Sequence, residues 1–169
     1  NNDGSYGFAG RVTYTPIKSN NFLLHLGAAT VQQKLDSDQT VRFSTRPESH
    51  YTDSKLLSTG TLRDVNSKSL YGIEAALVGG PWSLQGEYVN AQLDRDNRTD
   101  PDFNGWYIQG SWFATGDKRR YSSKSGVFTS VKPKSKYGAI ELVLRYSELD
   151  LEDATVSGGE GHNTTVGVN

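Results

Sequence analysis

A strict alternation of apolar and polar side chains in the stretch AIELVLRYSEL, residues 139–149, limits what this chain can fold into. Leu142, Leu144 and Tyr146 occupy every second position, and polar or charged residues such as Arg145 lie between them. Successive side chains of a β-strand point to opposite faces of a sheet, so the stretch is a strand with one apolar and one polar face. The apolar face points inward in a soluble sheet and outward, toward lipid, in a membrane barrel.

The same pattern recurs along the chain and predicts an all-β antiparallel up-and-down meander. Besides the opening stretch, it marks five full strands and the start of one more: residues 6–15, 22–33, 69–78, 82–93 and 106–113, and the closing TTVGVN. No segment keeps the 3.6-residue period of a helix. Strands that follow one another in sequence are expected to pair. Six strands do not close an outer-membrane barrel, which needs about eight, so we expect an open, curved sheet.

Aromatic residues lie near the ends of these strands, with small aliphatic residues between them. If the short turns are periplasmic, one aromatic row comprises Tyr14, Phe22, Trp82 and Trp112, and the other comprises Phe8, Tyr71, Tyr88, Trp106 and Tyr146. Two aromatic rows flanking an aliphatic band are typical of the lipid-facing surface of a barrel. The pattern therefore favours a transmembrane β-barrel over a soluble β-sandwich, the alternative that would bury the same residues in a core.

Composition excludes several kinds of site. The formal net charge is -1, so no overall positive field attracts nucleic acid. Cysteine is absent, which excludes disulfides and thiolate metal sites within the chain. The three histidines, His25, His50 and His162, have no ligand spacing, and no pattern brings serine, histidine and aspartate together. We therefore expect neither an enzyme nor a bound metal or cofactor.

Two long segments interrupt the strand pattern, residues 34–68 and 114–136. The second has seven basic residues against Asp117 alone, a formal charge of +6, whereas the first is nearly balanced. Arginine suits oxyanions because its planar guanidinium donates paired hydrogen bonds. The basic run could instead be a solvated or lipopolysaccharide-contacting segment, and Arg46 and Glu48 could pair inside a structural loop.

Residues 42–60 and 106–151 resemble recurring segments of the phosphate-selective porin O and P family. The second matches through Thr115-Gly116-Asp117, Tyr121, Gly126-Val127-Phe128, Pro133 and the strand from Glu141 to Ser147. The closing TTVGVN resembles the start of the next family strand, so we expect the protein to continue. The resemblance implies a bacterial outer-membrane barrel of about sixteen strands that assembles as a homotrimer. Residues 1–169 would form one part of it, with six full strands and one partial strand.

The resemblance also implies a passive, water-filled channel for small anions such as phosphate, in contact with outer-membrane lipid and lipopolysaccharide. Both long segments are expected to fold into the lumen, with Tyr121 and Phe128 anchoring the second. The candidate anion-binding and pore-lining residues are Arg42, Arg46, Lys118, Arg119, Arg120, Lys124, Lys132 and Arg145. Two alternatives stay open: the same barrel without anion selectivity, and a soluble β-rich module that binds glycans or proteins.

Overall fold

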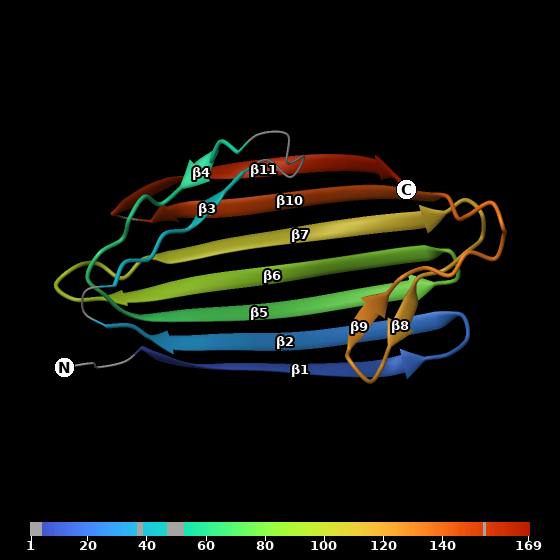
Figure 1. The fold of residues 1–169 in the computed structure, drawn as a ribbon, viewed down its shortest axis with the longest axis horizontal. Helices are drawn as coiled ribbons and strands as arrows, with labels where there is room; N and C mark the ends of the chain where they lie inside the picture. The colour runs from blue at the N-terminus through green and yellow to red at the C-terminus, as the bar shows by residue number, and fades with distance from the viewer. Residues whose placement is uncertain (1–4, 37–38, 47–52, 154) are drawn as a thin grey trace.

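Seven long antiparallel strands form one open sheet in the computed structural model, which describes residues 5–36, 39–46, 53–153 and 155–169 (Figure 1). The strands are β1 (Tyr6–Lys18), β2 (Phe22–Lys34), β5 (Val65–Gly79), β6 (Trp82–Arg95), β7 (Asp102–Phe113), β10 (Glu141–Asp153) and β11 (Val156–Val168). Their order across the sheet is their order in the chain. The predicted all-β meander of sequential neighbours is confirmed.

The seventh strand corrects the sequence-based prediction of a partial strand after a long loop. β11 has 13 residues and begins at Val156, which pairs with Asp153 at the end of β10. Its glycines break the alternating pattern in the sequence, because the packing leaves no room for a side chain at these positions. A Cβ atom at Gly158 would collide with the carbonyl oxygen of Leu151, and one at Gly161 would lie 3.0 Å from Leu57.

Two small antiparallel hairpins belong to the long segments and were not predicted. The first pairs β3 (Ser44–Thr45) with β4 (Leu57–Ser58), and the second pairs β8 (Arg120–Ser122) with β9 (Val127–Thr129). In Figure 1 the β8–β9 hairpin lies over β1, β2 and β5, whereas β3 and β4 lie at the opposite corner, near β10 and β11. Both hairpins contact the same face of the sheet, which we call the covered face.

The opposite face, which we call the exposed face, carries the apolar residues of the alternating pattern. Leu84, Ile108, Leu142 and Leu144 lie there with 41–58% of their surface exposed. Trp82 stacks on Trp112 near one end of the strands, with ring centroids 5.4 Å apart. Trp106 packs against Tyr146 near the other end, at 5.5 Å. The two aromatic rows expected from the sequence therefore border an uncovered aliphatic band.

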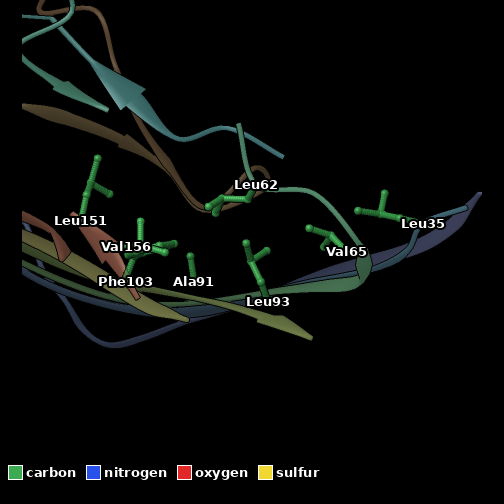
Figure 2. Packing of buried hydrophobic residues seen from close by; sticks show 8 residues of the cluster. All are labelled: Leu35, Leu62, Val65, Ala91, Leu93, Phe103, Leu151 and Val156. Carbon is green, nitrogen blue, oxygen red and sulfur yellow. The ribbon is translucent and has the colours of Figure 1, made fainter. Parts of the chain in front are cut away.

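Eight buried apolar residues form a cluster on the covered face, beneath the 34–68 segment (Figure 2). Phe43 from that segment meets Phe103 of β7 edge to face, with ring centroids 5.6 Å apart. The cluster consists of Leu35, Leu62, Val65, Ala91, Leu93, Phe103, Leu151 and Val156. Apolar burial of this kind fixes one end of the covered face, because each buried aliphatic side chain contributes about 1.5–3 kcal/mol. The described residues include no helix that is long and apolar enough to cross a membrane.

Candidate functional site

Polar and charged side chains line the covered face between the two hairpins. They come from the positions of β6, β7 and β10 that alternate with the exposed apolar residues: Gln85, Glu87, Tyr107, Gln109, Glu141 and Arg145. All six are partly buried. Since side chains alternate across a strand, the apolar exposed face necessarily leaves a polar row on the other side. This row is the part of the molecule best suited to contact water and dissolved ions.

Glu74 of β5 is the centre of a polar network beneath the β8–β9 hairpin. The Arg11 guanidinium donates to the Glu74 carboxylate through Nε at 3.1 Å and also through Nη2. The Nε2 atom of His25 lies 3.1 Å from the same carboxylate oxygen, and the Nδ1 atom of His25 lies 2.6 Å from the Tyr121 hydroxyl. His25 is 4% exposed. The network joins β1, β2 and β5 to the hairpin through buried and half-buried polar groups.

Arg119 of the 114–136 segment lies in the same region and contacts the seven-stranded sheet. Its Nη1 donates to the Gln85 side-chain oxygen of β6, and its guanidinium carbon lies 4.1 Å from the centre of the Phe128 ring. Burial lowers the pKa of the Arg119 guanidinium from its ordinary value, while the nearby Glu141 carboxylate opposes that shift.

A second arginine extends this arrangement along β7 and β10. The Arg145 guanidinium carbon lies 3.7 Å from the centre of the Tyr107 ring, a cation–π contact. The Tyr107 hydroxyl accepts a hydrogen bond of 2.9 Å from Gln85 Nε2. Gln85 and Tyr107 therefore connect Arg119 and Arg145 across three strands. A recess of about 170 Å³ lies beside Gln85 and Tyr107. It is also lined by Arg11, His25, Glu74 and Phe128.

The other predicted basic residues are not gathered at this point. Lys118 donates to the backbone carbonyl of Asn20. Arg120, Lys124 and Lys132 are exposed. Arg119 therefore contacts the sheet, whereas its neighbour Arg120 is exposed.

The two candidates in the 34–68 segment have partners inside that segment. Arg42 Nε donates to Ser58 Oγ at 3.1 Å. Arg46 pairs with Asp53 at 2.6 Å. The expected alternative partner, Glu48, lies outside the described residues. Internal pairing of Arg46 reduces the positive charge that this segment presents.

Asp117 organises the base of the 114–136 segment. Its carboxylate accepts hydrogen bonds from the Thr115 hydroxyl at 2.6 Å and from the Lys134 backbone N–H at 2.8 Å. These hydrogen bonds lower the pKa of the Asp117 carboxyl below its ordinary value. The acidic residue of the Thr-Gly-Asp turn therefore has a structural role, since it ties the two ends of the segment together.

Arg11, Glu74, Gln85 and Tyr107 were absent from the candidates chosen from the sequence. Their one sequence signal is their position on the polar side of an alternating strand, which many other residues share. No group of histidine, cysteine, aspartate or glutamate residues within the described part of the chain has the geometry of a metal site.

Comparison with known proteins gives a consistent result. A family model described as phosphate-selective porin O and P matches residues 1–169. An uncharacterized protein of Caulobacter vibrioides is 36% identical over 165 residues, which cover 94% of this chain and 33% of that protein. Porin O of Pseudomonas aeruginosa is 37% identical over 91 residues, which cover 52% of this chain and 21% of that protein. The chain thus spans about a third or less of the length of these relatives.

Proposed function

The chain belongs to the phosphate-selective porin O and P family, and we propose from that premise that it forms an arc of the wall of a passive, water-filled outer-membrane channel. Such a channel acts without an enzymatic step or a cofactor. Its surroundings would be outer-membrane lipid and lipopolysaccharide. The remaining strands of the barrel would come from the rest of a longer protein, which we expect to assemble as a homotrimer.

The observation that carries this proposal is the contrast between the two faces of the sheet. Large aliphatic residues on the exposed face have no cover, and aromatic residues border them at both ends. A soluble protein seldom leaves such a wide continuous apolar surface in water. Lipid would cover that face in a barrel, and the covered face with its charged and polar row would then line the lumen.

Small anions such as phosphate are the proposed solutes. Arg119 and Arg145 are held on the covered face by Gln85, Phe128 and Tyr107. Guanidinium groups fixed in this way offer paired N–H donors to an oxyanion with little further loss of side-chain freedom. The segment 114–136 adds a formal charge of +6 near the same water path. Both features favour anions over cations of similar size.

A channel without anion preference is the second candidate, and the ion pairs on the covered face support it. Arg11 is paired with Glu74, and Arg46 with Asp53. Neutralised pairs contribute little net field to the lumen, so selectivity would depend on Arg119 and the exposed basic residues of the 114–136 segment. The anion-selective channel and the channel without anion preference differ in how far removal of a single arginine changes the anion permeability.

Single-channel recording of the full-length protein in planar lipid bilayers tests the proposal. Arg119→Ala removes an arginine that contacts the wall, and Arg120→Ala is the matched control, since it removes the same charge from the adjacent, exposed residue. For an ion passing about 7 Å from the group in water, one charge changes the relative anion permeability roughly two- to fivefold. We expect that reduction for Arg119→Ala, together with weaker block of chloride current by phosphate.

The reversal potential in a salt gradient gives the permeability ratio directly. Equal effects of the two substitutions would remove the special role of Arg119. A wild-type channel with no anion preference would support the second candidate. Failure of the wild-type protein to form pores in lipid would contradict the channel itself.

A further inference from the structure

The β8–β9 hairpin is structurally separate from the wall on which it lies. Its two strands hydrogen-bond to each other and form a sheet of their own, apart from the seven-stranded sheet. Backbone pairing joins the 114–136 segment to the wall near its ends, where Ala114 N–H donates to the Ile140 carbonyl. The hairpin itself is therefore held by side chains, which can be released without breaking the sheet.

Two of the contacts between the wall and the hairpin depend on Glu74, and we call them its two arms. In the first arm, Arg11 binds the Glu74 carboxylate and also donates to the Gly126 carbonyl oxygen at 3.2 Å. In the second arm, His25 lies between the same carboxylate oxygen and the Tyr121 hydroxyl. One carboxylate thus orients two of the side chains that contact the hairpin.

The sheet leaves space for this carboxylate at one position. Gly27 of β2 lies directly opposite Glu74 of β5 in the register. A Cβ atom at Gly27 would collide with the Glu74 side chain. The absence of a side chain at position 27 therefore lets Glu74 lie across β2, where Arg11 and His25 meet it.

Further contacts around these arms are polar or aromatic. Thr15 Oγ1 lies 3.3 Å from the Tyr121 hydroxyl, and Lys18 donates to the Ser123 hydroxyl. The Tyr121 and Phe128 rings meet edge to face at 5.4 Å, and the Phe128 ring also meets the His25 ring at 6.4 Å. The eight-residue apolar cluster lies under the other long segment and is separate from Leu23, Ala76 and Val78, which are buried on β2 and β5.

The hairpin carries a large charge for its size. Residues 118–129 contain four basic residues and no acidic one. Each elementary charge that moves across a potential of about 0.1 V changes the equilibrium between two positions about fiftyfold. Four charges that each cross a quarter of that potential have the same combined effect. An applied field therefore acts strongly on a segment that only side chains hold in place.

We propose that residues 118–129 are a voltage-responsive gate that Glu74, through Arg11 and His25, locks against the channel wall. This proposal rests on the proposed channel function. At the polarity that pulls the basic hairpin along the pore, the lock opens and the released hairpin obstructs the lumen. The opposite polarity keeps the hairpin at its end of the pore, so the response is asymmetric in voltage.

Bilayer recordings of the full-length protein with Glu74→Gln test the lock. Its matched control is Glu87→Gln, because Glu87 is the cross-strand partner of Glu74 and loses the same charge on the same face. At a fixed voltage of the effective polarity, we expect the ratio of obstructed to open dwell time to rise at least tenfold for Glu74→Gln. For Glu87→Gln we expect it to stay within about twofold of wild type. Equal shifts in the two variants would overturn the lock.

A reversible crosslink tests the movement itself. A Cβ atom at Gly126 would lie 3.3 Å from the Cβ of Thr13, close to the separation of about 3.5–4.5 Å in disulfides. Thr13→Cys with Gly126→Cys, in a background without other cysteines, should therefore tether the hairpin to β1. We expect the oxidised pore to conduct with unchanged anion preference and without voltage-dependent steps, and we expect reduction of the same pore to restore the steps.

The outcomes separate this gate from the channel that it serves. Steps of equal size and frequency before and after reduction, in a protein shown to be crosslinked, would contradict hairpin movement. An anion-selective pore whose wild-type form shows no polarity-dependent steps would overturn the gate and leave the proposed channel standing. Absence of any pore would contradict the proposed function first, and the gate with it.

Discussion

Replacing Leu144 by arginine tests whether the exposed face lies in lipid. Leu144 is 58% exposed and lies in the aliphatic band between the two aromatic rows. In water, arginine at such a position costs little, since substitutions on an exposed surface usually change stability by less than about 0.5 kcal/mol. In a bilayer the same substitution places a cation in hydrocarbon. The two environments therefore predict different free energies of unfolding.

The depth of Leu144 sets the expected size of the effect. Trp106 and Trp112 mark the two aromatic rows on β7, and the six residue steps from one to the other correspond to about 20 Å along a strand. Leu144 pairs with Gly110, which is about 7 Å along the strand from Trp112. Arginine costs about 2–4 kcal/mol at the midplane of a barrel and less near the interface. We expect a loss of about 2 kcal/mol, or roughly a thirtyfold change in the folding equilibrium.

Leu56→Arg is the matched control. Leu56 is 68% exposed, like Leu144, but lies in the 34–68 segment on the covered side of the sheet. We expect this substitution to change the free energy of unfolding by less than about 0.5 kcal/mol. Reversible urea titration of the full-length protein in lipid vesicles, followed by tryptophan fluorescence, measures both variants. If the two variants have the same stability, the exposed face is not in lipid and the barrel interpretation fails.

Two further substitutions test the packing of the covered face. Gly27→Ala places a methyl group where the Glu74 carboxylate lies. We expect the free energy of unfolding to fall by about 1–3 kcal/mol in the same urea titration. A decrease below about 0.3 kcal/mol would show that Glu74 moves aside freely. Asp117→Asn removes the carboxylate charge that the hydrogen bonds from Thr115 and Lys134 stabilise. The pKa of Asp117 is lower in the folded state than in the unfolded state. The stabilisation is therefore present above the unfolded pKa of about 4 and is lost as the pH falls through the lower folded value. The rate of amide hydrogen exchange in the 114–136 segment, corrected for its intrinsic pH dependence, should therefore rise in acid for the wild-type protein. For Asp117→Asn the rate should already be high at neutral pH. Identical pH profiles of the two proteins would contradict this role of Asp117.

Strand positions could be predicted from the sequence because alternation is a local property. Most of the long strands have one apolar side, and the two-residue period shows it wherever that side carries large residues such as Leu84 or Ile108. β11 was missed over most of its length because Gly158, Gly159 and Gly161 interrupt the alternation. Those glycines allow close contact with Leu57 and Leu151, and a contact between distant segments leaves no periodic trace in the sequence.

The candidate site was less predictable for the same physical reason. The basic composition of the 114–136 segment is visible in the sequence, but the choice of Arg119 over Arg120 depends on how the segment folds onto β6. The link from Arg11 to Glu74 joins residues 63 positions apart, and Gly27 matters only because the register places it opposite Glu74. Sequence therefore predicts the kind of side chain on each face, whereas three-dimensional packing decides which of these side chains meet.

The sequential order of the strands has a consequence for how such a wall can change in evolution. Each long strand pairs only with its neighbours in the chain, so duplication or loss of one hairpin would widen or narrow the sheet without rerouting the remainder. The two long segments restrict this freedom. The connection between β2 and β5 contacts β7 and β11, and the 114–136 segment contacts β1 and β2. Loss of the β5–β6 hairpin would remove Glu74 and Gln85 together. The contacts on the covered face, more than the strand pairing, thus limit how the width of the sheet can change.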